Sequence, residues 1–335
     1  MPIIITIISL IFTFLSKLSK PKKSRIEPTE FDHNLRVENY PNPFPNGWFN
    51  LCSSSSVKKG KVIEVHAFDQ KFAVFRGENG MVKVFDVFCP HLNANLADGF
   101  VKGNNLVCPF HGWEFNGAGY CTDVPYAENM PPRIVDKQAL QHYVVKEDNR
   151  AIWMWYHPDN EAPHWQLDHV PEMNDGDFWT QSETREWIVN CHIQDTNENA
   201  VDKAHFAYVH TSEYVPEGDV EVDGHRRVTN LASKTMAFSE QGVPLEGEFV
   251  DTNFTSKSFG PGFTWQHFRG VTNSVMMGMI TPIDQESVHL RFLFLYPEMK
   301  TDIEKLFNSG YIDNVCTQVE QDMLIWNHKH YQPNP

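Results

Sequence analysis

The stretches Cys89-Pro90-His91 and Cys108-Pro109-Phe110-His111 lie in the first half of the 335-residue chain, with sixteen residues between them. Each stretch offers one thiol and one imidazole, and each follows a predicted strand, at 82–88 and at 105–107. The prolines and Gly112 favour tight turns with few backbone donors. The pattern therefore predicts two hairpin tips that can close over one shared metal group.

Four side chains divided in this way fit a [2Fe–2S] cluster in which Cys89 and Cys108 hold one iron and His91 and His111 hold the other. A structural zinc site is the alternative, but zinc fingers usually pair Cys with a nearby Cys and His with a nearby His. Each half-site here is mixed, which favours the iron–sulfur cluster. The remaining cysteines lack such spacing and are expected to be small buried side chains: Cys52, Cys121, Cys191 and Cys316.

A second group of possible metal ligands occupies residues 198–210, Glu-Asn-Ala-Val-Asp-Lys-Ala-His-Phe-Ala-Tyr-Val-His. Two imidazoles and one carboxylate make the facial triad of non-haem Fe(II) oxygenases, and His205 and His210 are the candidate imidazoles. On a straight helix the two side chains would point about 140° apart, so they converge only if the predicted helix, about 191–205, ends or kinks between them. Taken alone, such a pair is more often a surface or core feature than a metal site.

Three carboxylates are candidates for the other roles around this pair. Asp202 lies one helical turn before His205. It either binds the iron or accepts a hydrogen bond from the ring N–H of a histidine that binds the iron. Glu198 lies one further turn back on the same polar stripe. The candidate third ligand is Asp322, in Val319-Glu-Gln-Asp-Met-Leu-Ile-Trp326, with a solvated helix carboxylate as the alternative.

The composition limits the classes of partner. With 28 Lys and Arg against 43 Asp and Glu, the formal charge is -15, which argues against duplex nucleic acid. The sequence has no glycine-rich phosphate loop, because Asn-Gly-Ala-Gly at 116–119 is too short for a dinucleotide fingerprint. Electrons must therefore arrive from another protein. Six cysteines in a chain of this length are no disulfide scaffold, and they favour a reducing compartment.

Residues 1–25 predict a membrane anchor with a basic flank. Residues 3–15 are apolar apart from two Thr and one Ser, and a helical run to Leu18 would cover roughly 25 Å, the short end of a membrane span. Five basic residues between 17 and 25 then predict a single-pass protein with a cytoplasmic body, and so short a span suits the endoplasmic reticulum. A cleaved signal peptide is the alternative, but no basic side chain precedes the run and no small-residue cleavage site follows it.

The rest of the chain is predicted to have two parts. The first contains strands only, and the second contains strands and helices. Strands are predicted at 61–68, 72–76, 81–88 and 151–156, with Asn79-Gly80 as a hairpin turn. A strand at 179–189, the helix at 191–205 and several strands within 226–296 follow. Residues 301–331 have helical spacing, with a break predicted at Gly310. An apolar group within the second β-rich region is expected to belong to the core: Phe263, Met276, Met277 and Met279.

At these two groups of residues the chain resembles the Rieske non-haem iron oxygenases. Cys-x-His, sixteen residues and Cys-x-x-His match the cluster motif of the family, and Glu-x-x-x-Asp-x-x-His-x-x-x-x-His matches its mononuclear iron motif, within a likeness that covers nearly all of 43–331. The resemblance implies two sets of ligands: Cys89, His91, Cys108 and His111 for the cluster, and His205, His210 and Asp322 for the mononuclear iron.

The resemblance also implies an assembly and a fold. Asp202 would be the bridge for electrons between an iron-binding histidine and a cluster histidine of the neighbouring subunit, in a homotrimer served by a separate NAD(P)H-dependent reductase or ferredoxin. The implied fold is α+β, with an N-terminal membrane helix, an all-β Rieske [2Fe–2S] domain at 44–158, and a catalytic domain at 165–335. The catalytic domain would be an antiparallel sheet with helices, similar to a helix-grip fold.

Within this family the likeness is greatest to the cholesterol 7-desaturases of the Neverland type. It rests on the stretches 89–97, 108–115, 124–128, 189–194 and 260–262. It implies O2- and NAD(P)H-dependent introduction of a C7–C8 double bond into cholesterol or a related sterol. A hydroxylase or side-chain-cleaving oxygenase of steroids is the enzymatic alternative, and an electron carrier is the non-enzymatic one. Two departures stand out: Asn93 occupies a position where Gly is common, and the sequence ends thirteen residues after Asp322, where relatives usually continue.

Overall fold

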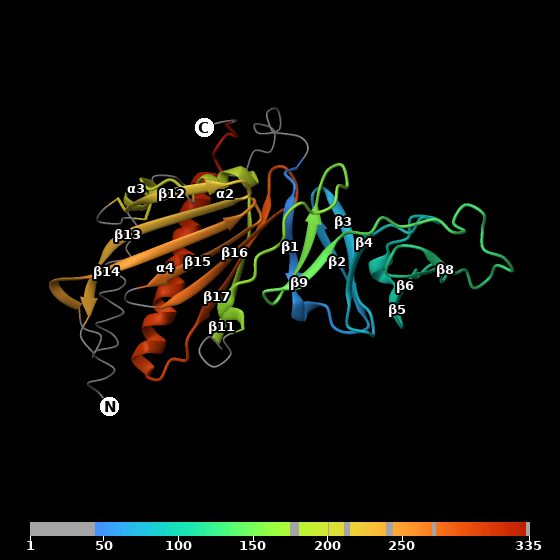
Figure 1. Cartoon of the computed structure of the whole chain (residues 1–335), viewed down its shortest axis with the longest axis horizontal. Coiled ribbons are helices and arrows are strands. Elements are labelled where there is room, and N and C mark those ends of the chain that lie inside the picture. Colours follow the sequence, from blue (N-terminus) through green and yellow to red (C-terminus); the bar gives the residue numbers. More distant parts are fainter. Residues whose placement is uncertain are drawn as a thin grey trace.

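The computed structural model describes residues 44–174, 181–199, 201–210, 215–238, 244–269 and 273–332. These residues form an elongated molecule, with small sheets from the first half of the chain at one end and one large sheet with its helices at the other (Figure 1). The predicted α+β class, with an all-β part first and a part of sheet and helices second, is confirmed for the described residues.

Three small antiparallel sheets occupy the first end, in the orders β1-β10-β9, β2-β3-β4 and β5-β6-β7-β8. The predicted hairpin turn is confirmed, because Gly80, at φ 85°, lies between β3 and β4. The bounds of these elements are β1 Gly47–Ser53, β2 Lys61–Ala67, β3 Gln70–Arg76, β4 Val82–Asp86, β5 Phe100–Lys102, β6 Asn105–Val107, β7 Glu114–Phe115, β8 Cys121–Asp123, β9 Val145–Asp148 and β10 Ala151–Tyr156, with short helical turns η3 Ser54–Ser56, η4 Leu96–Asp98 and η5 Pro171–Met173.

The second end is one seven-stranded antiparallel sheet in the order β11-β17-β16-β15-β14-β13-β12. Strands β12 to β17 form a meander in which each strand pairs with the next. Strand β11, the first in the sequence, pairs with β17 and forms the edge of the sheet. The elements are β11 Gln181–Val189, α2 Ile193–Asn199, α3 His205–Tyr208, β12 Glu217–Asp223, β13 Arg226–Phe238, β14 Pro244–Phe259, β15 Phe263–Arg269, β16 Ser274–Pro282, β17 Val288–Tyr296 and α4 Asp302–Trp326.

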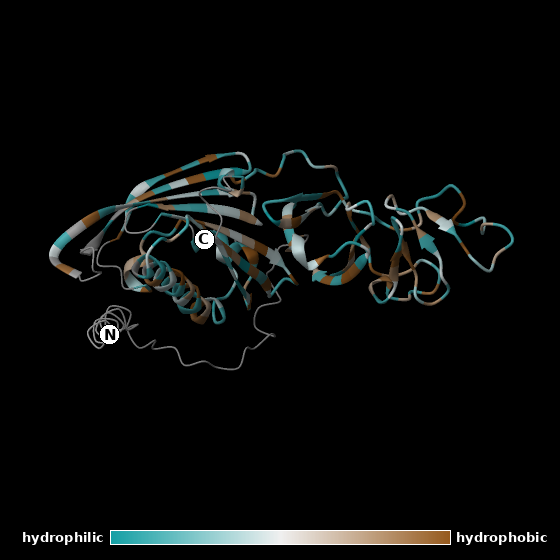
Figure 2. Ribbon diagram, turned by 90° about the horizontal axis from the view of Figure 1, so that it is seen from below, coloured by the Kyte–Doolittle hydropathy of each residue, from teal (hydrophilic) through white to brown (hydrophobic). Residues whose placement is uncertain are grey.

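Helix α4 runs beneath the curved large sheet (Figure 2). Thr301 and Glu304 form a capping box at its start, each side chain accepting a hydrogen bond from the other's backbone N–H. The predicted break at Gly310 is wrong, because α4 continues through it. A glycine costs a helix about 1 kcal/mol relative to alanine. Burial of Ile312 and Val319 in the core beneath the sheet outweighs that cost.

One hydrophobic core joins the two ends of the molecule. Phe49 of β1 and Met154 of β10 share this core with Met276 of β16 and Ile312 of α4. The expectation that Met276 is a core residue is confirmed, as it is for Phe263, Met277 and Met279, which lie in a second core.

Backbone contacts also hold the junction. Thr281 Oγ1 donates a 2.6 Å hydrogen bond to the carbonyl of Asn50, which links β16 to β1. Gly262 lies against β1 so closely that a Cβ there would sit 2.6 Å from the Trp48 carbonyl and 2.6 Å from Phe49 Cδ1. Such close packing fixes the small sheets relative to the large one.

The predicted localisation, a single-pass membrane protein of the endoplasmic reticulum with a cytoplasmic body, is contradicted. Within the described ranges no helix is both long enough and apolar enough to cross a bilayer. Helix α4 has the length, but six charged residues are spread along it. The predicted anchor at 1–25 lies outside the described residues.

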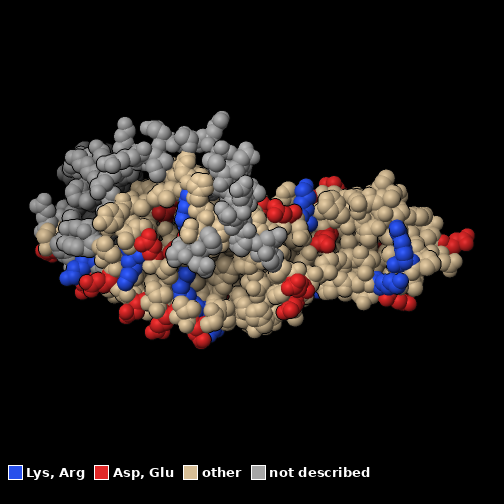
Figure 3. Space-filling model, turned by 90° about the horizontal axis from the view of Figure 1, so that it is seen from above, with Lys and Arg blue, Asp and Glu red and all other residues tan. Residues whose placement is uncertain are grey.

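Acidic and basic side chains are interspersed over the surface. Figure 3 shows Asp and Glu alternating with Lys and Arg on the face drawn. Several basic side chains are held by carboxylates, such as Arg76 by Glu147 and Arg291 by Glu186, each with a 2.7 Å contact. In both pairs the arginine is largely buried and the carboxylate is partly exposed, so each pair fixes local geometry and adds about 1 kcal/mol at most.

Candidate metal centres

The two predicted cluster loops lie together at the far end of the small sheets, one before η4 and one between β6 and β7 (Figure 1). Their backbones follow one pattern. Cys89 and Cys108 each donate an N–H to the carbonyl five residues later, at 2.9 Å. Asn93 and Gly112, each four residues after its cysteine, donate back to the cysteine carbonyls at 2.9 and 3.1 Å.

Asn93 and Gly112 also share an unusual backbone conformation, with φ of 55° and 71°. Glycine adopts this left-handed region freely, and asparagine is among the few other residues that visit it. Asparagine at position 93 is therefore compatible with the same loop conformation that Gly112 adopts.

The four predicted cluster residues converge. The thiols of Cys89 and Cys108 are buried and interact with each other. The ring centroids of His91 and His111 lie 4.8 Å apart, and the His91 ring stacks on Trp113 at 4.5 Å. Two thiols therefore lie inside the loops, and two half-buried imidazoles lie nearer the surface.

The donor set fits a [2Fe–2S] cluster. His91 Nδ1 is buried and has no hydrogen-bond partner in the part of the chain that the structure describes, as expected of a nitrogen kept for a metal. Burial raises the pKa of Cys89 to about 12, although the backbone N–H groups of His91 and Leu92 oppose this effect. Metal ions in this position would replace the two thiol protons and supply the positive charge that buried thiolates need.

The second site depends on an interrupted helix. The sequence predicts one helix at 191–205, but α2 ends at Asn199 and α3 begins at His205. Helix α3 is a single turn, and Val209 N donates to the His205 carbonyl at 2.7 Å. This short turn begins at His205 and ends at Tyr208, before His210, and the rings of the two histidines converge with centroids 5.0 Å apart. The two rings could converge only if the helix ended or kinked between His205 and His210. Helix α3 ends between them, so this condition is met.

Three predicted ligands meet at this point. One ligand atom from each of His205, His210 and Asp322 lies within 4.8 Å of the other two. His210 Nε2 is 3.4 Å from Asp322 Oδ1, and both side chains are almost fully buried. Asp322 arrives from α4, more than a hundred residues later in the chain. Two imidazoles and one carboxylate in this arrangement are the donor set of a facial Fe(II) triad.

Each ligand is held on the side that faces away from the other two. The Asp202 carbonyl accepts from His205 Nδ1, and Gln321 Oε1 bonds His210 Nδ1 at 3.0 Å. Asn199 Nδ2 donates to Asp322 Oδ2 at 2.8 Å. The ring nitrogen left for a metal is then Nε2 on both histidines. Sequence reasoning missed two of these holding residues, whose only signal was adjacency to predicted ones: Asn199 and Gln321.

Electrostatics favour a cation at this site. Burial lowers the pKa of His210, but the adjacent Asp322 carboxylate more than compensates, so the net pKa is raised. A buried carboxylate that stabilises a positive imidazole would also stabilise a metal ion in place of the proton.

The carboxylates of the other two predicted residues, Asp202 and Glu198, do not join the group of ligand atoms. Asp202 is exposed, and its Oδ1 accepts from the N–H groups of Ala204 and His205 at 2.9 and 3.3 Å. Glu198 accepts from Gln194 and pairs with Lys329. Neither belongs to the group of three ligand atoms.

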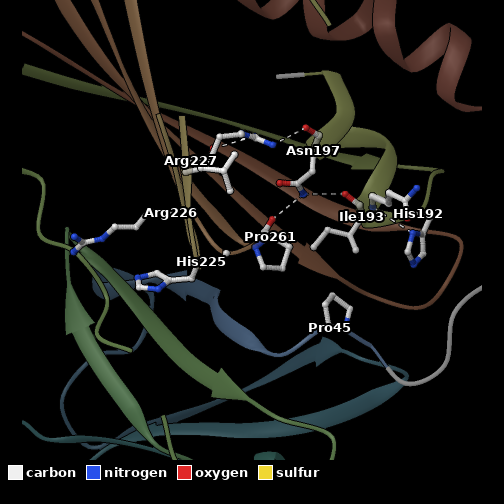
Figure 4. Close-up of a pocket in the computed structure, with 13 residues that line it drawn as sticks. Pro45, His192, Ile193, Asn197, His225, Arg226, Arg227 and Pro261 are labelled. Atoms are coloured by element: carbon white, nitrogen blue, oxygen red, sulfur yellow. Dashed lines mark hydrogen bonds between the residues drawn. The ribbon is translucent and has the colours of Figure 1, made fainter. Parts of the chain in front are cut away.

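A cavity of about 520 Å³ lies at the junction of α2 with the turn between β12 and β13 (Figure 4). Pro45, Ile193 and Pro261 contribute apolar wall, and Arg227 donates to the Asn197 carbonyl at 3.2 Å. The residues that line the cavity do not include the three ligands, so it is distinct from the metal triad.

Comparison with known proteins divides the chain into two matches. Residues 47–143 match the Rieske [2Fe-2S] domain, and residues 154–335 match the 3-ketosteroid 9alpha-hydroxylase C-terminal domain. Cholesterol 7-desaturase nvd 1 of Ciona intestinalis is 31% identical, over 89% of this chain and 66% of its own length. The oxygenase component of 3-ketosteroid-9-alpha-monooxygenase from Rhodococcus rhodochrous is 29% identical, over 90% of this chain and 81% of its own.

A solved structure shares the fold. The crystal structure of dicamba monooxygenase bound to dicamba superposes with a TM-score of 0.65, covering 84% of this chain and 86% of that one at 20% identity. At this identity the likeness concerns the fold alone.

Proposed function

This chain belongs to the Rieske non-haem iron oxygenases, and from that premise we propose that it is a sterol desaturase. The reaction introduces a C7–C8 double bond into cholesterol or a related sterol. Two hydrogens leave the sterol, a separate reductase supplies two electrons from NAD(P)H with two protons, and O2 is reduced to two waters. The carrying observation is that one chain combines the paired cluster loops with the buried triad of His205, His210 and Asp322.

The two metal groups have different roles in the proposed reaction. When bound, the cluster held by Cys89, His91, Cys108 and His111 transfers single electrons, and the iron held by the triad activates O2. The chain's own residues orient both groups. Gln321, Asn199 and the Asp202 carbonyl fix the ligands, and burial of the triad excludes bulk water from the reacting position.

The proposed assembly is a homotrimer in which the cluster end of one copy meets the triad end of the next. The cluster loops and α3 lie toward opposite ends of the elongated molecule (Figure 1), so electrons need a route between copies. Leu92 and Phe110, in the two cluster loops, are 61% and 62% exposed, and exposed apolar side chains of this size favour a covered surface. Asp202 is proposed as the bridge, since it touches His205 while its carboxylate remains exposed.

Two domains are proposed to carry these sites, the cluster domain at 44–158 and the catalytic domain at 165–335. Strand β10 ends at Tyr156 and β11 begins at Gln181, so the boundary would fall in the connection between them. The proposal also includes one iron held by the triad in the catalytic domain and a separate reductase that supplies electrons to the cluster domain.

Hydroxylation or side-chain cleavage of a steroid is the second candidate. The observation that favours it is the match of 154–335 to a steroid hydroxylase domain. Either reaction uses the same ligands, and the difference lies in whether the substrate loses a second hydrogen or gains an oxygen.

The test is turnover with product identification. The full chain, loaded with iron and cluster, is incubated with a reductase, NADPH, O2 and a panel of sterols, and the products are read by mass spectrometry. Loss of two hydrogens supports the desaturase, and gain of one oxygen supports the alternative. No sterol product beyond that of a His205→Ala control, with both metal sites loaded in the parent, would refute both.

A further inference from the structure

Helix α2 carries two carboxylates, Asp195 and Glu198, and no basic residue. Only 3% of the Asp195 side chain is exposed. A buried carboxylate that lacks a counter-charge is costly, because the protein interior solvates it poorly. Within the described part of the chain, the base that pairs with both carboxylates is Lys329, whose Nζ lies 2.7 Å from Asp195 Oδ1 and also contacts Glu198. The charge balance of α2 therefore depends on a residue outside the helix.

Lys329 belongs to residues 328–332, a short segment that follows α4 and lies beside α2 (Figure 1). Two further contacts join this segment to α2. Tyr331 Oη donates to Gln194 Oε1 at 2.9 Å, and Gln194 Nε2 donates to the carbonyl of Gln332 at 3.0 Å. Gln194 and Glu198 are one turn apart, so the segment covers one face of α2.

These contacts continue the contact that holds the metal triad. Asn199, directly after Glu198 in α2, donates to Asp322 Oδ2 at 2.8 Å. From Asn199 back to Gln194 along α2, the partners run forward from Asp322 to residues 329–332. A shift of α2 away from α4 would therefore break the contact with Lys329 and the contact with Asp322 together.

The ion contact is suited to fixing α2. Burial alone would lower the pKa of Lys329, but hydrogen bonds with the carboxylates of Asp195 and Glu198 raise it overall, so Lys329 is a cation at neutral pH. The other oxygen of Asp195, Oδ2, accepts from the backbone N–H of His192 at 3.1 Å. One buried carboxylate thus links Lys329 to the backbone at the start of α2, through hydrogen bonds that charge strengthens.

We propose that Lys329 is a positioning residue for the mononuclear iron: it holds α2 against α4 and so keeps the Asn199 amide on the ligand Asp322. The inference rests on the proposed iron site at the triad. Lys329 is not one of the three ligands, so its effect passes through Asn199. Without the ammonium, α2 gains by moving outward to hydrate Asp195, and that movement withdraws Asn199 from Asp322.

The test measures iron affinity. Fe(II) is titrated against a graded chelator without O2, with the oxidised cluster's absorbance as internal reference. Lys329→Met keeps the length of the side chain and removes its charge. It should weaken iron binding roughly 3- to 10-fold, less than the loss of Asn199 itself, because Lys329 acts at one further remove. Lys329→Arg should restore most of the affinity, since a guanidinium can bond both carboxylates. The matched control is Lys305→Met, an exposed partner of Asp302 on α4, which should bind iron as the parent does.

A double variant separates positioning from general loss of stability. If Lys329 acts through Asn199, Lys329→Met added to Asn199→Ala should weaken iron binding no further than Asn199→Ala alone. Additive losses would overturn the proposal, as would parental affinity in Lys329→Met. Equal loss of cluster and iron would also overturn it, because that result indicates unfolding. Tyr331→Phe removes one contact of the same segment and serves where Lys329→Met does not fold. It should weaken iron binding roughly 2-fold in the parent, the effect of part of one neutral hydrogen bond, and leave Asn199→Ala unchanged.

The outcome is independent of turnover. Iron bound in the expected order by parent and variants, with no sterol product, would refute the desaturase and leave the role of Lys329 intact. Sterol product from a parent whose iron affinity is unaffected by Lys329→Met would refute only the role of Lys329.

Discussion

Asn199 Nδ2 donates a 2.8 Å hydrogen bond to Asp322 Oδ2, which leaves Oδ1 facing His210. One residue at the end of α2 thus sets the orientation of a carboxylate on α4. We expect Asn199→Ala to weaken iron binding at the triad by about 10- to 100-fold, as losses of outer partners of metal ligands do. Iron retained against a graded chelator measures this, with cluster absorbance as internal reference. Asn197→Ala is the matched control, because Asn197 bonds the Pro261 carbonyl instead. Equal iron retention in all three proteins would show that Asn199 has no holding role.

Asp202 offers a test of the bridge. Asp202→Asn keeps an oxygen that can accept from the Ala204 and His205 N–H groups but removes the charge, and Asp202→Ala removes both. Both variants should keep iron and cluster largely loaded and should let the reductase reduce the cluster. Turnover should fall by on the order of 100-fold, the effect of misplacing a reacting group. His205→Ala should differ by emptying the triad while the cluster keeps its colour. Parental turnover in Asp202→Ala would show that Asp202 has no bridging role and only holds the backbone before α3.

Asn93 tests the backbone symmetry of the cluster loops. Because its φ is 55°, Asn93→Gly should leave cluster content and stability unchanged or slightly improved. Asn93→Val should lower stability by about 1–2 kcal/mol, since a β-branched residue is strained in that region. Visible absorbance during thermal unfolding reports both. A valine variant as stable as the glycine variant would mean that the loop changes conformation.

Gly262 tests the junction between the two ends. A methyl group there would lie 2.6 Å from the Trp48 carbonyl, so Gly262→Ala should destabilise the protein by about 1–3 kcal/mol. Gly117→Ala is the control, because its nearest neighbour is the flexible side chain of Lys83. Urea unfolding of the two variants should separate them, and identical midpoints would contradict the tight contact.

The ion pair of Glu147 with Arg76 should stabilise the fold more at neutral pH than at acidic pH. Two hydrogen bonds from Arg76, at 2.7 and 2.8 Å, hold the pKa of Glu147 below its ordinary value of 4.5. The pair therefore stabilises the fold above about pH 4.5, and the contribution is lost as pH falls through the lowered pKa. Glu147→Gln should cost about 1 kcal/mol at pH 7, because the pair is partly exposed. Unfolding midpoints of parent and variant should converge as the pH falls through the lowered pKa of Glu147, and a constant difference would exclude this ionisation as the cause.

The spacing in the sequence predicts Cys89 with His91 and Cys108 with His111 as the cluster residues, because each loop carries one thiol and one imidazole. The structure brings the four side chains together, which agrees with that prediction. The His205–His210 geometry was also predictable as a condition, since helix pitch alone required an interruption between them. Asp322 was only a candidate, because its partner residues lie more than a hundred positions earlier.

What the sequence could not supply depends on packing. Asn199 and Gln321 become holding residues only when α4 places Asp322 beside Asn199 and Gln321 beside His210, and no local pattern encodes that approach. The predicted break in α4 at Gly310 is wrong because it rested on the low helix propensity of glycine alone. Burial of Ile312 against the sheet keeps the helix intact. The localisation failed for another reason: it rested on residues 1–25, and the described residues provide no membrane-spanning helix.

The cluster loops lie toward one end of the molecule and α3, which carries His205 of the triad, toward the other (Figure 1), and this has a genetic consequence. In the proposed trimer, a chain with Cys89→Ser keeps a usable triad, and a chain with His205→Ala keeps a usable cluster. Neither is active alone. Co-expressed, they should complement each other, because some head-to-tail contacts join an intact cluster to an intact triad. A defective allele would then be partly masked by a different defective allele, but not by a second copy of itself.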